Sequence, residues 1–202
     1  MRVDFVKVDL EMLDLKWAVK YCGEWEKRRE DIPFYTIGKS AYLDGLTDKY
    51  YKHKDRLNAA LMKIGPIMYE KVLGVLSDYF KEDVSLDDAL AYPGFHIFVN
   101  HPVLMTTSGN WHCDIPHETL GLGCEDAFTF TLAVEMPEGG GGIDVYNEKG
   151  DHEYVEHKVG YMMLHDGESV HRIASLKENG GKPRITLQGH IIRKEGKLIA
   201  FW

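Results

Sequence analysis

The spacing of apolar residues changes its period at Phe95, and this change constrains the fold more than any other feature of the chain. Before Phe95, apolar residues recur every three or four positions, as they do on one face of an α-helix. After Phe95, apolar and polar residues alternate, as in strands with one buried face. The chain therefore divides into a mostly helical region, residues 1–94, and a stranded region, residues 95–202. Its 202 residues fit a single domain that buries a substantial core.

The first region begins with an expected strand over residues 3–9, followed by an expected helix over residues 10–28. Large apolar residues recur every fourth position along this helix, which predicts a buried stripe. The stripe consists of Leu13, Trp17, Tyr21 and Trp25.

Two further helices are expected over residues 48–64 and 66–81, because Gly65-Pro66 ends one and suits the first turn of the next. Ser85 with Asp88 resembles the capping box of a short helix that ends before Pro93. We expect these helices to pack on the outside of a sheet.

The second region predicts eight short strands and a possible ninth. Eight strands with no helices among them favour a double-sheet jelly roll over a βα barrel. The expected fold is thus mainly β with α: a double-stranded β-helix (jelly-roll, cupin-like) core, with an N-terminal helical layer outside it. The strands are expected at 95–100, 111–115, 127–135, 142–147, 152–158, 161–165, 169–175 and 183–193, with a last one at 197–202.

The triplet His112-Cys113-Asp114 carries the strongest chemical signal, together with His171 further along the chain. Side chains alternate along a strand, so His112 and Asp114 share a face. With His171 they form a two-histidine-one-carboxylate set, which holds iron(II) and leaves coordination positions open. Arg184 adds a fork of donors suited to an organic carboxylate. Alone, His-x-Asp is a weak signal, and a solvated strand end is the alternative.

The order of these residues resembles the iron(II)/2-oxoglutarate-dependent oxygenases. The family pattern is His-x-Asp, a distal His, and Arg-x-Ser/Thr on the last core strand. Here it reads His112-Cys113-Asp114, His171 and Arg184-Ile185-Thr186, within roughly residues 95–193. The resemblance implies that His112, Asp114 and His171 ligate Fe(II). It also implies that Arg184 and Thr186 bind the distal carboxylate of 2-oxoglutarate.

The reaction implied by the resemblance uses O2 and 2-oxoglutarate to oxidise an unactivated C–H bond, with succinate and CO2 as co-products. Hydroxylation is the default outcome, and desaturation, cyclisation or epimerisation stay open. Asp114 occupies the position that a chloride needs, which argues against halogenation. Zinc hydrolysis stays possible with the same ligands, with Glu118 as the nearest candidate base.

Strand parity gives further candidates for the cavity. Arg184, Thr186, Gln188 and His190 share one face of their strand, which either lines a cavity or is solvated. His96 is interpreted as a hydrogen-bonded core histidine, with contact to the cosubstrate as the alternative. The remaining candidates are expected in loop or surface roles: His117, His152, His157 and His165.

The prediction of the substrate pocket is supported by the fewest residues. Trp111 precedes the first ligand, and Asp144 shares a face with Tyr146 on a strand that we expect to turn one polar face into the barrel. Asp144 or Glu135 is expected to pair with the ammonium group of a free amino acid. The alternative is that both carboxylates are solvated.

The composition of the chain argues against some classes of binding partner and some locations in the cell. A net charge of −8 argues against a nucleic-acid surface. No apolar stretch has the length of a membrane span, and the start of the chain, Met1-Arg2-Val3-Asp4, lacks signal-peptide features. Three cysteines without CxxC spacing indicate reduced thiols in the cytoplasm.

The expected substrate is therefore a small molecule, such as a free amino acid or a related metabolite. A peptide or protein side chain is the alternative within the enzyme class. From another class, the chain fits a jelly-roll binding module without activity. The sequence leaves the oligomeric state open.

Overall fold

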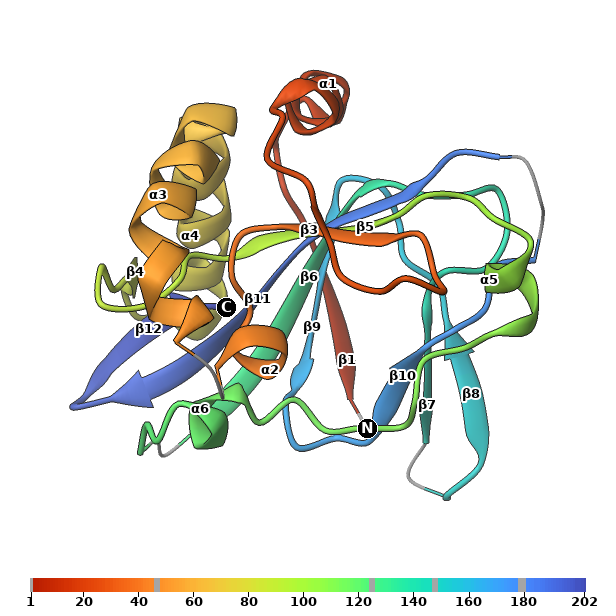
Figure 1. The fold of residues 1–202 in the computed structure, drawn as a ribbon. Helices are drawn as coiled ribbons and strands as arrows, with labels where there is room; N and C mark the ends of the chain where they lie inside the picture. The colour runs from red at the N-terminus through yellow and green to blue at the C-terminus, as the bar shows by residue number, and fades with distance from the viewer. Residues whose placement is uncertain (1, 46–47, 124–125, 147–148, 178–180) are drawn as a thin grey trace.

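Two β-sheets, antiparallel except for the pairing of β4 with β12, form the centre of the computed structural model, with a cavity between them (Figure 1). The structure describes residues 2–45, 48–123, 126–146, 149–177 and 181–202. The large sheet runs in the order β1-β9-β6-β11-β5-β3-β2, with β12 on β11 and β4 on β12. The small sheet has the order β10-β7-β8. This is the jelly roll that the second half of the sequence predicts.

The strand bounds define the two sheets. The large sheet contains β1 (Val3–Lys7), β2 (Glu26–Lys27), β3 (Phe34–Ile37), β4 (Val84–Leu86), β5 (Gly94–Phe98), β6 (Ala127–Glu135), β9 (Tyr161–Asp166), β11 (Arg184–Lys194) and β12 (Lys197–Phe201). The small sheet contains β7 (Ile143–Tyr146), β8 (His152–Val155) and β10 (His171–Ile173). The end of the predicted strand 142–147, Asn147, lies outside the described residues.

Three longer helices cover the outside of the large sheet, as expected (Figure 1). They are α1 (Met12–Tyr21), α3 (Lys49–Ile64) and α4 (Pro66–Phe80); the short helices are α2 (Ala41–Asp44), α5 (Val103–Thr106) and α6 (Pro116–Thr119). Apolar residues of the three longer helices share one buried core with the outward face of the sheet. On β11 that face carries Ile185, Leu187 and Ile191, which leaves the even-numbered residues for the other side.

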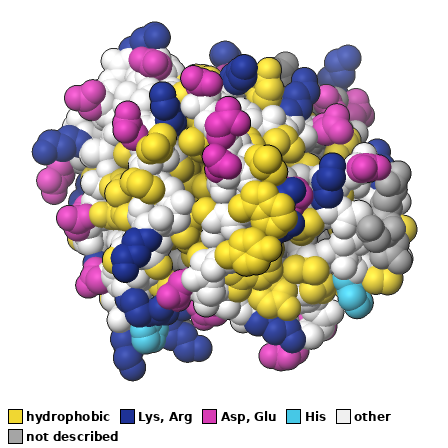
Figure 2. Space-filling model, turned by 90° about the horizontal axis from the view of Figure 1, so that it is seen from above, with side chains coloured by type: hydrophobic (Ala, Val, Ile, Leu, Met, Phe, Trp, Pro, Cys, Tyr) yellow, Lys and Arg dark blue, Asp and Glu magenta, His cyan; other side chains and the backbone are white. Residues whose placement is uncertain are grey.

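The predicted stripe of the first helix is wrong. Leu13 and Tyr21 are 58% and 79% exposed, whereas Leu15 and Val19 are buried against the sheet. The helix ends at Tyr21, before Gly23 in the left-handed region (φ +72°), so the expected stripe has no continuous helix to lie on. Figure 2 views the molecule from the side on which α1 lies, and apolar side chains gather there.

Two further predictions of secondary structure are wrong. Residues 84–86 form β4, which pairs in parallel with β12, rather than the start of a helix capped by Ser85. The predicted strand 111–115 is reduced to a single bridge between His112 and His171, because the chain turns into α6 at Pro116. The N-terminal half also contributes β1 to β4 to the large sheet, beyond the opening strand that the sequence indicates.

No helix in the described part of the chain combines the length and apolar character that crossing a bilayer requires.

Candidate metal centre

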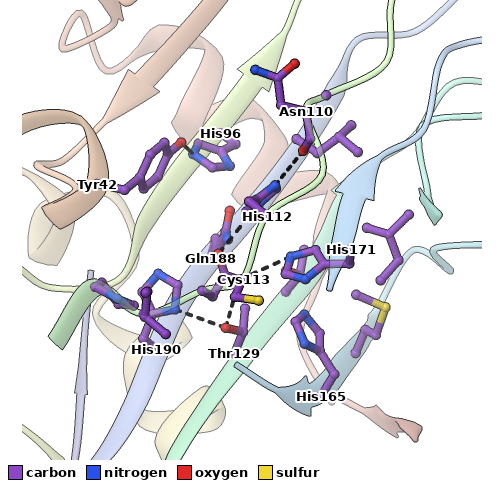
Figure 3. Close-up of a pocket in the computed structure, with 18 of the residues that line it drawn as sticks. Tyr42, His96, Asn110, His112, Cys113, Thr129, His165, His171, Gln188 and His190 are labelled. Atoms are coloured by element: carbon purple, nitrogen blue, oxygen red, sulfur yellow. Dashed lines mark hydrogen bonds and ion pairs between the residues drawn. The ribbon is translucent and has the colours of Figure 1, made fainter. Parts of the chain in front are cut away.

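Three potential metal ligands converge between the sheets, and two of them, His112 and His171, are labelled in Figure 3. One ligand atom from each of His112, Asp114 and His171 lies within 4.8 Å of the other two. Nε2 of His112 is 3.7 Å from Oδ1 of Asp114, and Nε2 of His171 is 3.3 Å from Oδ2. The backbones of the two histidines exchange hydrogen bonds of 2.9 Å in each direction, which brings their rings side by side.

Backbone carbonyls orient both imidazoles. Nδ1 of His112 lies 2.7 Å from the carbonyl oxygen of Asn110, and Nδ1 of His171 lies 2.8 Å from that of Ser169. A carbonyl oxygen only accepts, so each Nδ1 carries the proton and donates it. The Nε2 atoms therefore face the site, as in histidines that ligate metals. Two imidazoles and one carboxylate in this arrangement fit iron(II).

Asp114 is ionised although it is buried. Burial alone raises the pKa of its carboxyl, but the hydrogen bond with His171 and nearby imidazoles hold that pKa far below its usual range. Thr129 Oγ1 also donates to Oδ2 of Asp114 at 2.9 Å. Burial opposes protonation of His171, yet Asp114 raises the pKa of that imidazole above its ordinary value. A metal ion bound here would displace this proton.

The three residues line a cavity of about 390 Å³. The large sheet contributes polar side chains to it, and the small sheet contributes Ile143 and Ile173 beside His171. The even-numbered face of β11 lines this cavity, so the cavity alternative is correct for Arg184, Gln188 and His190. Thr186 is fully buried next to Arg184.

Arg184 is a buried cation without a matching anion. Only 3% of it is exposed, and it forms no ion pair with any carboxylate in the described part of the chain. Nε donates to the carbonyl of Gly141 at 2.7 Å, and Nη1 donates to Thr186 Oγ1 at 3.1 Å. Burial lowers the pKa of Arg184 to about 10, so it stays charged at neutral pH. A buried guanidinium of this kind suits the carboxylate of a ligand.

The glycine run at residues 139–142 makes the Gly141 contact possible. Gly140 has φ +78°, and a Cβ there would lie 2.3 Å from the carbonyl oxygen of Ser175. Gly141 is also left-handed, at φ +72°. Only glycine accepts both conditions, so this turn places a carbonyl oxygen against Arg184.

Several histidines lie deeper than the sequence indicates. His117, His157 and His165 are buried, which contradicts the expected surface roles, although His157 lies in a loop as expected. His152 is exposed, as expected. His165 lines the cavity beside His171, and His157 Nε2 lies 3.4 Å from Nη2 of Arg184. His165 and Met163 lie two residues apart on β9, so they share the face that lines the cavity. The alternation of side chains along this strand is the sequence signal that points to His165.

His96 is the buried, hydrogen-bonded histidine that the sequence favours, and its contact with a cosubstrate stays a prediction. It lines the cavity, and its Nε2 is 2.6 Å from the hydroxyl of Tyr42. Burial lowers the pKa of His96 well below the ordinary value, so the ring is neutral. Tyr42 follows no periodic signal in the sequence, because it lies on a helix of one turn, α2.

The residues expected around the substrate lie outside the cavity. Asp144 accepts from Arg172 Nε at 2.9 Å and lies 3.1 Å from His152 Nε2, while Trp111 stacks on Tyr146. The inward residue of β7 is Ile143, so the expectation of an inward polar face is wrong. Glu135 pairs with Lys16 and Lys20 of α1.

No protein-family model matches the chain, and no curated protein is similar to it. Solved structures share its fold at low sequence identity. An N-substituted L-amino acid dioxygenase from Burkholderia ambifaria AMMD aligns with 99% of this chain and 86% of its own, with a TM-score of 0.61 and 11% identity. SnoN, a non-heme α-ketoglutarate-dependent epimerase from nogalamycin biosynthesis, aligns with 96% of this chain and 81% of its own (TM-score 0.54, 11% identity).

The dioxygenase has also been solved in complex with α-ketoglutarate, which is 2-oxoglutarate; that structure has a TM-score of 0.54 and 12% identity. At these identities the likeness concerns the fold. The jelly roll of this chain is the fold of those oxygenases, as the resemblance in the sequence predicts.

Proposed function

We propose that this protein is a non-haem iron(II)- and 2-oxoglutarate-dependent oxygenase that oxidises an unactivated C–H bond of a small molecule. A free amino acid or a related metabolite is the proposed substrate. The observation that carries the proposal is a single cavity in which the two imidazoles and one carboxylate of the candidate metal site lie together with a buried guanidinium. The shared fold of an amino acid dioxygenase supports the substrate class.

In the proposed mechanism, His112, Asp114 and His171 hold the metal. Iron(II) bound there, with 2-oxoglutarate and O2, would supply the oxidation of the C–H bond, with succinate and CO2 as co-products. Arg184 binds the distal carboxylate of 2-oxoglutarate, and Thr186, whose Oγ1 accepts from Arg184, fixes the direction of that fork. Thr129 holds the Asp114 carboxylate by a hydrogen bond.

The remaining cavity residues control access. Ile143, Ile173 and Met163 form an apolar wall, which excludes water from the neighbourhood of the reacting carbon. His165 and His190 have pKa values lowered by burial to about 4, so both are neutral and do not attract a second anion at neutral pH.

We also propose that the protein works on small molecules in the cytoplasm rather than on nucleic acids. The net charge of −8 supports the first point, and the free thiols of Cys22 and Cys113 support a reducing setting. Cys124 lies outside the described residues.

Iron-dependent formation of succinate from 2-oxoglutarate, without added substrate, tests the proposal. We expect slow succinate formation that a chelator abolishes, that is lost in His171→Ala and that is kept in His152→Ala, an exposed histidine. Stimulation by peptides rather than by amino acids would favour the protein-hydroxylase alternative. Tight iron binding without any succinate would contradict the proposal and favour a binding module.

A further inference from the structure

A second cavity, of about 470 Å³, opens beside the metal cavity. The two cavities share lining residues, including Phe34, Phe98, Asn110 and Arg184, so they are direct neighbours. Asn110 also holds the ring of His112 through its carbonyl oxygen. This second cavity, here called the side chamber, therefore borders the candidate metal centre.

The inner wall of the side chamber is apolar. Its residues form a small hydrophobic cluster separate from the main core: Ile32, Phe34, Leu104 and Leu176, with Phe98 and Val103 packed against them. The rings of Phe34 and Phe98 are stacked, with centroids 4.5 Å apart. A cluster that borders open volume instead of filling it suits the apolar part of a small ligand.

Charged groups lie at one place on this wall. Nε and Nη2 of Arg29 donate to the two carboxylate oxygens of Asp31 at 3.0 and 2.7 Å, and both side chains are more than half exposed. Among the described lining residues, the only other charged side chain is Arg184, which the proposed function assigns to 2-oxoglutarate. The charged side chains that remain for a second ligand are thus one cation, Arg29, next to one anion, Asp31.

This pair selects between kinds of head group. A ligand that carries only a carboxylate would compete with Asp31 for Arg29 and be repelled by Asp31. A ligand that carries only an ammonium group would meet the converse problem at Arg29. A zwitterion satisfies both side chains, and the exposed position keeps the cost of desolvating them low.

We propose that the side chamber binds an α-amino acid with an aliphatic or aromatic side chain. Its carboxylate lies on Arg29, its ammonium group on Asp31, and its side chain runs along Phe34 and Leu104 toward the metal centre. This inference rests on the proposed function and specifies the substrate class of the same site.

Calorimetric titration of the protein, loaded with iron(II) and 2-oxoglutarate without O2, tests the inference with defined probes. Along the series L-2-aminobutyrate, L-norvaline and L-norleucine, affinity should rise roughly fourfold per methylene group, because each one is buried on the apolar wall. L-norleucine should also bind roughly fivefold more tightly than hexanoate, which lacks the ammonium group, and than pentylamine, which lacks the carboxylate.

Two substitutions separate the contributions of the head group. Arg29→Gln should remove the advantage of L-norleucine over pentylamine and keep its advantage over hexanoate, and Asp31→Asn should do the reverse. Arg2→Gln is the matched control, because Arg2 pairs with Asp4 in the same i, i+2 arrangement away from both cavities. Val103→Phe should fill the chamber and weaken L-norleucine more than L-2-aminobutyrate, with near-UV circular dichroism confirming the fold.

The inference is overturned if L-norleucine does not bind, if it binds no better than both truncated probes, or if Arg2→Gln acts like Arg29→Gln. Succinate formation by the wild type without any amino acid is measured in parallel. If succinate forms and no probe binds, the substrate class is wrong and the oxygenase proposal stands. If amino acids bind and no succinate forms, the oxygenase proposal fails instead.

Discussion

Backbone carbonyls select which imidazole nitrogen faces the candidate metal centre. The carbonyl oxygens of Asn110 and Ser169 each accept a hydrogen bond from Nδ1–H of a histidine, so the site presents two Nε2 atoms and one carboxylate. Which imidazole nitrogen faces the site is therefore decided by backbone carbonyl groups, and the pattern of side chains in the sequence does not show these contacts. These contacts also explain why a single bridge between His112 and His171 suffices without a longer strand.

At the residue scale, Arg184→Ala should raise the 2-oxoglutarate concentration required for half-maximal succinate formation by at least about thirtyfold, because it removes a buried charge partner of the carboxylate. Iron binding should persist. Arg172→Ala is the control, since Arg172 pairs with Asp144 outside the cavity. An unchanged requirement for 2-oxoglutarate would show that another residue is the anchor.

Asp114→Gly should reduce succinate formation to background, because it removes the one anionic ligand and opens a coordination position. Asp144→Asn, a carboxylate already paired with Arg172 and His152, should stay near wild-type activity. Near-full turnover of Asp114→Gly without an added replacement ligand would exclude Asp114 from the triad.

At the scale of elements, hydrophobic period and parity predict the regular parts of the fold. Helices α3 and α4 begin and end within a residue of the predicted bounds, and β6 has the predicted bounds. In long segments many positions support the same hydrophobic period, so one atypical residue does not change the prediction. The short strands β2 and β4 escape prediction, since two or three residues cannot show a period. β4 pairs with β12, which is distant in sequence, whereas β2 pairs with the next strand, β3.

Helix α1 offers a matched pair of leucines that tests its corrected orientation. Leu15→Ala should lower the free energy of unfolding by about 2–3 kcal/mol, because Leu15 is 5% exposed in the core. Leu13→Ala, on the exposed face, should change it by less than about 0.5 kcal/mol. Chemical denaturation of both variants measures the difference, and equal effects would contradict the orientation of α1.

At the scale of the whole molecule, the jelly roll and the clustering of the three candidate metal ligands follow from the sequence, and the side chamber does not. The triad lies on three residues that parity and the resemblance connect. The side chamber combines the β2–β3 loop, α5 and the end of β10, which meet only once the two sheets and their loops are in place. The sequence therefore predicts Asp144 at the substrate, whereas in the structure Asp144 pairs with Arg172 and the loop pair Arg29 and Asp31 lies on a chamber wall.

The closing strand β12 ties the N-terminal half to the large sheet through Trp202, the residue after it. Trp202 is fully buried, accepts a hydrogen bond from Tyr50 and approaches Gly94 so closely that a Cβ there would lie 2.3 Å from its ring. Trp202→Ala should cost about 3–5 kcal/mol of stability. Trp17→Ala, on an exposed face, should cost far less, and similar losses in thermal unfolding would contradict this packing.

A crystal structure of the protein with Mn(II) and 2-oxoglutarate tests the central claim most directly. We predict one ion held by His112 Nε2, Asp114 and His171 Nε2, with the distal carboxylate of 2-oxoglutarate on Arg184. An ion bound elsewhere, or a cosubstrate whose carboxylate avoids Arg184, would contradict the proposed function.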